Sequence, residues 1–120
     1  MSVVAAALVA LVGLIHAYIL VLEMFLWQTD RGRKAFGTTA EQAATMATLA
    51  ANQGLYNGFL AAGLFASFLL PAESAFLFRV FFLGCVIVAG VYGGLTVSRR
   101  ILLVQALPAA LALGAVLLAG

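Results

Sequence analysis

The chain alternates four long apolar runs with three short polar breaks. The apolar runs extend over Val3–Trp27, Ala43–Leu70, Ala75–Val97 and Ile101–Leu118. A helix needs about 20 residues to cross the hydrocarbon core of a membrane, and each run is close to that length. The pattern predicts an all-α integral membrane protein with a single membrane domain over residues 1–120, whose four helices lie at about residues 3–27, 40–70, 75–97 and 101–118.

Each polar break has a local reason to end a helix. The first break, residues 28–39, carries four charged residues and two glycines, and Thr38 with Glu41 fits a capping box that would start the next helix. The second break, residues 71–74, begins with a proline, and the third is the short segment 98–100. Links this short make neighbouring helices antiparallel, so the pattern predicts a four-helix bundle.

The basic residues of the breaks predict the orientation in the membrane. Three lie in the first break, two in the third and none in the second. Short loops rich in Lys and Arg face the cytoplasm, so the first and third loops are predicted to be cytoplasmic, with both termini outside. Arg79 lies about one turn inside the third helix, near the outer face, where we expect it to snorkel outward or to pair with Glu73.

The composition excludes a soluble domain of this size. The chain is 66% hydrophobic and 8% charged, with a mean hydropathy of +1.20. No Lys or Arg precedes the first run, which is longer than the apolar region of a signal peptide, so we expect it to remain as a spanning helix. The lipid bilayer is therefore the expected partner, and the expected location is the bacterial cytoplasmic (inner) membrane, crossed several times.

The positive net charge does not indicate a nucleic-acid partner. The formal charge is +2, and the six basic residues cluster at helix ends, where they orient the protein in the membrane. The single cysteine, Cys85, lies inside an apolar run and is interpreted as a small packing residue.

Small residues recur at four-residue spacing on three of the predicted helices. Such stripes let helix backbones approach closely inside lipid. They serve packing within one chain and packing between copies equally well, so a homo-oligomer through these stripes remains open. The stripes are Gly54, Gly58, Ala62 and Ala66; Ala89 with Gly93 and Gly90 with Gly94; and Ala106, Ala110 and Gly114.

Glu23 is the strongest candidate for function, because a carboxylate near the end of an apolar run needs water, a proton or a partner. At 100° per residue, His16 and Glu23 share one face of the first helix. Seven residues separate them, or about 10 Å along the axis, which is too far for both to bind one metal ion. We expect no metal site and no cofactor.

The other polar side chains of the apolar runs are predicted to join Glu23. Four of them cover one arc of the second helix and would be costly facing lipid, so the arc is expected to face the bundle or a water-filled cavity. Counted from the helix ends, most lie in the cytoplasmic half. The predicted ligand- or proton-binding residues are Glu23, His16, Asn52, Gln53, Tyr56, Asn57, Tyr92, Thr96 and Gln105. The alternative is that the amides and hydroxyls only hold the helices together.

Four segments closely resemble a family of small bacterial membrane proteins known as domain of unknown function 1304. They are HAYILVLEMFLW (16–27), RGRKAFG (31–37), AANQGLYNGFLAAGL (50–64) and CVIVAGVYGGLTVSRRILLVQALPA (85–109). The resemblance covers nearly the whole chain and implies a membrane protein. It implies no reaction, since the family has no established activity, but its segments contain six of the candidate residues: His16, Glu23, Asn52, Gln53, Tyr56 and Asn57.

Three hypotheses for the function follow from these patterns. The first is a protein that binds or transports a small ligand through a polar pocket in the cytoplasmic half. In its size and first-helix glutamate the chain is similar to the small multidrug resistance exporters, although its charge bias disfavours their dual topology. The second is a membrane enzyme acting on a lipid-like or thiol-conjugated substrate, since residues 50–52 faintly resemble the membrane-associated glutathione and eicosanoid enzymes. The third is a structural or accessory subunit.

Overall fold

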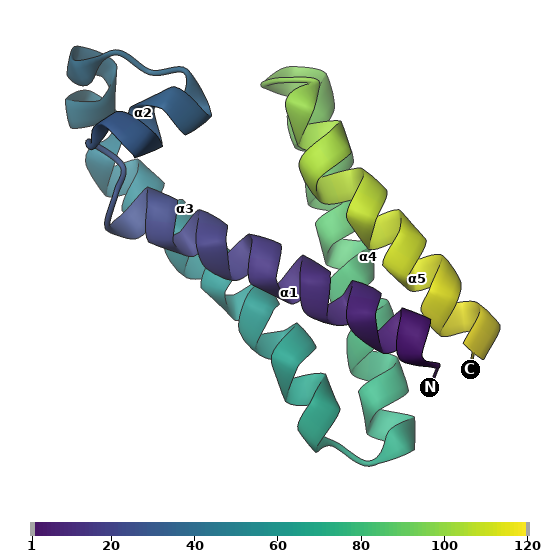
Figure 1. The fold of residues 1–120 in the computed structure, drawn as a ribbon. Helices are drawn as coiled ribbons and strands as arrows, with labels where there is room; N and C mark the ends of the chain where they lie inside the picture. The colour runs from purple at the N-terminus through teal and green to yellow at the C-terminus, as the bar shows by residue number, and fades with distance from the viewer. Residues whose placement is uncertain (1, 120) are drawn as a thin grey trace. The chain divides into compact units, whose positions relative to one another are not determined.

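The regular elements of the computed structural model, which describes residues 2–119, are all helices (Figure 1). The predicted all-α class is therefore confirmed for this part of the chain. Met1 and Gly120, the two ends of the predicted single domain, lie outside the described residues. In chain order the elements are α1 (Val3–Met24), α2 (Asp30–Phe36), α3 (Ala40–Ala66), the 3-10 turn η1 (Ser67–Leu69), α4 (Ala72–Thr96), the π-helical η2 (Leu102–Ala106) and α5 (Leu107–Ala119).

Three segments of the described chain are long and apolar enough to cross a membrane. They are α1, α4 and the continuous stretch Leu102–Ala119. They support the predicted membrane protein. α3 has 27 residues but is not among them, because the polar residues between positions 52 and 57 interrupt its apolar run.

The chain divides into two compact units, and both boundaries fall inside long helices. The hairpin unit is His16–Phe59, which contains the end of α1, all of α2 and α3 as far as Phe59. The core unit comprises residues 2–15 and 60–119 of the described chain. Each unit is described below by itself, and the single domain over the whole chain stays a prediction.

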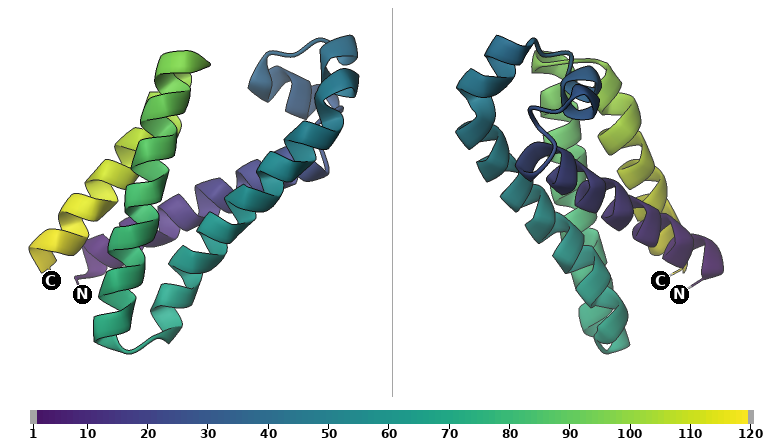
Figure 2. Two further views of the ribbon diagram at one scale, coloured as in Figure 1. Left: turned by 180° about the vertical axis from the view of Figure 1, so that it is seen from behind. Right: turned by 60° about the vertical axis from the view of Figure 1, so that its left-hand side comes forward.

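The core unit is held by apolar side chains and by the close approach of α4 to η2 and α5, which lie beside it in every view (Figure 2). A Cβ at Gly90 would lie 2.7 Å from the backbone nitrogen of Ala106, and one at Gly94 would overlap Leu102. Glycine is required here because the helices touch through their backbones. One cluster of buried apolar side chains in the unit consists of Ala5, Val9, Val12, Leu64, Leu83, Val86, Ala109, Ala112 and Val116.

Part of the predicted small-residue stripes therefore serves packing within the chain. On α4, Gly90 and Gly94 contact the C-terminal segment. On that segment only Ala106 makes the expected contact, whereas Ala110 is exposed and a Cβ at Gly114 would meet nothing within 4 Å. The homo-oligomer interface through the remaining small residues stays a prediction.

The last span starts with a π-helical turn that the apolar pattern did not predict. The N–H of Leu107 donates to the carbonyl of Leu102, five residues earlier. Pro108 follows directly, has no N–H, and its ring would clash with the carbonyl four residues before it. A widened turn accommodates the proline, because it removes the clash without breaking the helix.

The first polar break contains a short helix, α2, which the hydrophobic pattern also did not predict. Thr29 caps its start by accepting from the N–H of Gly32, and Gly37 ends it in the left-handed conformation, with φ 67°. The N–H of Thr39 donates to Oε1 of Gln42, whose N–H donates to Oγ1 of Thr39, so the capping box of α3 is Thr39–Gln42 and the predicted pair Thr38–Glu41 was wrong. Both pairs have the required spacing, so sequence alone could not choose between them.

Candidate functional site

Two glycines of α3 bring it close to the second half of α1 in the hairpin unit. A Cβ at Gly54 would lie 2.6 Å from Cγ of Met24 and 3.0 Å from Cβ of Glu23. A Cβ at Gly58, one turn further along, would lie 2.5 Å from Cδ1 of Leu20. Because neither glycine has a side chain, the two helices approach closely enough for short side chains to bridge them.

Asn57 makes that bridge and joins the two ionisable residues of α1. Its Oδ1 lies 2.9 Å from Nδ1 of His16, and its Nδ2 donates to Oε1 of Glu23 at 2.7 Å. Both partners are buried, with 1% of His16 and 5% of Glu23 exposed. The two side chains, two helical turns apart on α1, are therefore linked through one amide of α3.

The orientation of the Asn57 amide determines which nitrogen of His16 carries a proton. Nδ2 of Asn57 also donates to the backbone carbonyl of Gln53 at 3.1 Å, so both of its N–H groups face acceptors. A flipped amide would place its oxygen against a carbonyl and a carboxylate, which cannot donate. Oδ1 must then face His16 and accept from Nδ1–H, so in the neutral ring Nε2 carries the lone pair.

The other nitrogen of this histidine has no partner. Nε2 of His16 is buried and makes no hydrogen bond to any residue of the described chain. Most buried polar groups in folded proteins are paired, so each exception requires an explanation. Nε2 is therefore an unused acceptor, and the Asn57 amide that links His16 to Glu23 has no N–H left to donate to it.

The rest of the predicted polar arc of α3 does not enter this cluster. The side chains of Asn52, Gln53 and Tyr56 are exposed, and Gln53 contributes only its backbone carbonyl. Tyr56 stacks edge-on against Phe59, with ring centroids 5.9 Å apart. Of the four residues, the structure brings only Asn57 to Glu23, and a binding role for the other three stays a prediction.

The remaining candidates belong to the core unit. Tyr92 is 71% exposed, and Oγ1 of Thr96 donates to its backbone carbonyl at 2.7 Å. Gln105 is half-buried in the π-helical turn η2. That Tyr92, Thr96 and Gln105 join Glu23 in one site stays a prediction.

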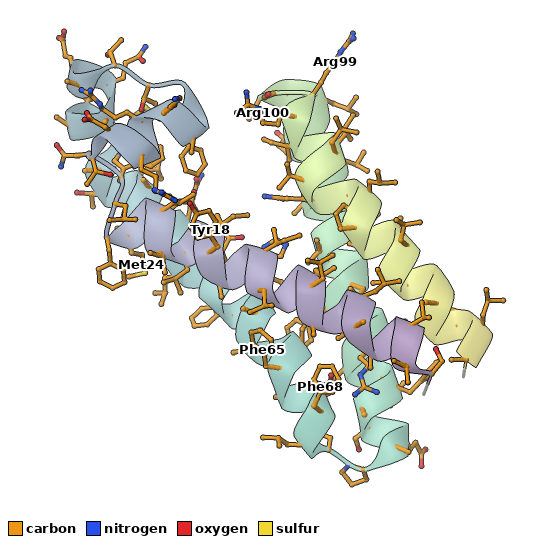
Figure 3. All side chains as sticks on the ribbon, viewed as in Figure 1. Tyr18, Met24, Phe65, Phe68, Arg99 and Arg100 are labelled. Carbon is orange, nitrogen blue, oxygen red and sulfur yellow. The ribbon has the colours of Figure 1, made fainter. Side chains whose placement is uncertain are left out.

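Sequence reasoning missed the contacts that close the hairpin unit at its loop end. Nε1 of Trp27 donates to the carbonyl of Ala43 at 2.9 Å, and its ring lies 4.9 Å from that of Phe36 in α2. Nη1 of Arg31 donates to the hydroxyl of Tyr18, which projects from α1 (Figure 3). The available signal was the run from Thr29 to Gly37, which has a good N-cap residue at its start and a glycine at its end.

The cluster does not have the composition of a metal centre. Within residues 2–119, no three His, Cys, Asp or Glu side chains come together in a way that could hold a metal ion. Its chemistry is that of hydrogen-bond acceptors, with one imidazole nitrogen and one carboxylate.

Comparison with known proteins agrees with the resemblance seen in the sequence. The profile of a family described as "Protein of unknown function (DUF1304)" matches residues 10–117. The chain is similar to the "Uncharacterized protein YpaA" of Lactococcus lactis subsp. lactis (strain IL1403), with 31% identity over 115 residues that cover 94% of this chain and 96% of that protein. No solved structure matches the chain.

Proposed function

This chain belongs to the DUF1304 family of proteins of unknown function, and we propose that it is a membrane protein whose hairpin unit binds a small ligand that donates hydrogen bonds. The observation that carries the proposal is the buried, unpartnered Nε2 of His16, whose other ring nitrogen is linked through Asn57 to the buried Glu23. We also propose that the protein transports this ligand across the membrane.

The class of ligand follows from what the three side chains can offer. His16 presents a lone pair and Glu23 a carboxylate, while both N–H groups of Asn57 are already used. A site made of acceptors favours a donor such as a primary ammonium group, whose charge also balances the carboxylate. The site disfavours ligands with carboxylate or phosphate groups, because these would be repelled by the Glu23 carboxylate and would find no hydrogen-bond donor there.

A purely structural role explains the site less completely. Asn57 and Glu23 alone would tie α3 to α1, in the way that interhelical hydrogen bonds hold other membrane helices. This structural role does not explain why Nε2 of His16, a second acceptor, is buried without a partner. An incoming N–H or O–H donor explains it.

The single histidine makes the proposal directly testable. Protein labelled with ¹⁵N-histidine in detergent micelles gives signals from His16 alone, and Nε2 responds when it accepts a hydrogen bond. We expect ethylammonium to shift the Nε2 signal saturably, and tetramethylammonium, a cation without N–H, to leave it in place. Acetate serves as the anionic control.

Two variants complete this experiment. Glu23→Gln removes the carboxylate and is expected to weaken ethylammonium binding at least tenfold, which corresponds to about 1.4 kcal/mol. Glu73→Gln removes an exposed carboxylate of the core unit and should leave binding unchanged. A saturable shift with acetate, or no response of His16 to any of the three probes, would contradict the proposal.

We further propose that α3 is a fourth span and that the four helices form a bundle, with both termini outside the bacterial inner membrane. The support is the charge of the links, since segments 28–39 and 98–100 carry five basic residues and segment 71–74 none. Alkaline phosphatase, which is active only outside the cytoplasm, should be active when fused at the C-terminus or inserted at 71–74. Activity of an insertion after Gly37 would contradict this topology.

A further inference from the structure

Arg79, a buried cation of the core unit, is held by contacts that the sequence did not predict. Its Nε donates to Oγ of Ser67 at 2.9 Å, and its Nη2 donates to the Ser67 carbonyl at 3.2 Å. Its guanidinium carbon lies 4.8 Å from the centre of the Phe68 ring. Of the two predicted arrangements, the pairing with Glu73 was wrong, because Ser67 in η1 supplies the acceptors instead.

These contacts position the guanidinium without neutralising it. Ser67 supplies neutral oxygens, and no carboxylate of residues 2–119 lies within 4.0 Å of the Arg79 nitrogens. The side chain is nevertheless only 8% exposed. A guanidinium has five N–H donors, and here Ser67 takes two of them, while a buried charge without a counter-charge is costly.

The place of Arg79 along α4 indicates where a counter-charge would come from. α4 has 25 residues and is therefore about 37 Å long, compared with a hydrocarbon core of about 30 Å. Arg79 follows the start of α4 by seven residues, or about 10 Å, and side chains of a helix lean toward its N-terminus. Its guanidinium therefore reaches toward the level at which lipid phosphates lie.

We propose that Arg79 binds the phosphate group of a membrane phospholipid, with Ser67 and Phe68 fixing the plane of the guanidinium. Guanidinium groups match phosphate oxygens through two parallel hydrogen bonds, which a lysine cannot reproduce. Within the core unit, Phe68 lies at the opposite end of α4 from Arg99 and Arg100 (Figure 3). The Arg79 site is thus separate from the basic third link and is also independent of the proposed ligand of the hairpin unit.

The direct test is a ¹⁵N–³¹P distance measurement by solid-state NMR on ¹⁵N-arginine-labelled protein in phosphatidylcholine bilayers. In the wild type we expect phosphorus to dephase one guanidinium signal. This dephased signal should be missing in Arg79→Lys, which keeps the positive charge but lacks the paired N–H donors of a guanidinium. Arg99→Lys is the matched control, because it removes an exposed arginine of the same unit and should leave the Arg79 signal in place.

A second measurement separates a lipid from a free anion and requires no variant to fold. The Nε signal of Arg79 in micelles of a nonionic detergent should move when short-chain phosphatidylcholine is added, and less than one tenth as far with inorganic phosphate at the same concentration. An equal response to inorganic phosphate would mean a free-anion site, and no dephasing in bilayers would mean that Arg79 only ties α4 to Ser67. Either result overturns the proposal.

Discussion

The hairpin unit and the core unit bring their helices together with the same small residue but fasten them differently. In both units glycines let helices approach closely, with Gly54 and Gly58 against α1 and Gly90 and Gly94 against the C-terminal segment. The hairpin unit adds hydrogen bonds between distant residues, from Asn57 and from Trp27. The contact of α4 with α5 is apolar, and in the core unit it is Arg79 that donates hydrogen bonds to a distant residue, Ser67.

Two residues that occur once in the chain allow the units to be observed separately. Trp27 lies in the hairpin unit, so tryptophan fluorescence follows that unit alone. Cys85 lies half-buried in the core unit, and its rate of thiol labelling follows that unit. Comparing the two signals during unfolding in SDS would test whether the units lose their structure together.

The largest effect is expected from Gly90→Ala in the core unit. The new methyl group would lie 2.7 Å from the nitrogen and 3.0 Å from Cα of Ala106, and a backbone cannot move aside as a side chain can. We expect a loss of about 1–3 kcal/mol in the free energy of unfolding, measured by Cys85 labelling in SDS. Gly114→Ala, which has nothing within 4 Å, should instead stabilise its helix by about 0.5–1 kcal/mol. Equal effects of the two substitutions would contradict the close packing of α4 on the C-terminal segment.

A smaller effect is expected from Asn57→Ala in the hairpin unit. The substitution removes the hydrogen bonds to His16 and Glu23, and interhelical hydrogen bonds in membranes average about 0.6 kcal/mol each, so the loss should be about 1 kcal/mol. Trp27 fluorescence should report this loss first. Asn52→Ala is the matched control, since Asn52 lies on the same helix with an exposed side chain and should change stability little. A control as harmful as the test variant would contradict the assignment of Asn57 as the bridging residue.

The main features of the fold could be predicted because they depend on apolar length and on strong breakers. Proline at position 71 and the charges of residues 28–39 and 98–100 end the apolar runs, and the helices follow from there. α2 and η2 could not be predicted in this way. α2 depends on capping by Thr29 and Gly37, and η2 depends on how a helix accommodates Pro108, and neither changes the average hydropathy.

The candidate site was predictable in its residue types but not in its pairing. Helical spacing placed His16 and Glu23 on one face of α1, and Asn57 contacts both of them. It could not show that Asn57, rather than its polar neighbours, spans the gap, because that depends on the rotation of α3 against α1. The partner of Arg79 could not be predicted for a similar reason, since its acceptor Ser67 lies in another element and is uncharged.

The bridge through Asn57 has a consequence for how the protein enters the membrane. α3 is too polar to be recognised as a span on its own, and it leaves the ribosome after α1. When the Asn57 amide is hydrogen-bonded to His16 and Glu23, it does not enter lipid as an unpaired polar group. The same hydrogen bond also partners the Glu23 carboxylate. On the proposed topology, in which α3 is a fourth span, the two helices would insert as a pair, each lowering the barrier for the other at the translocon.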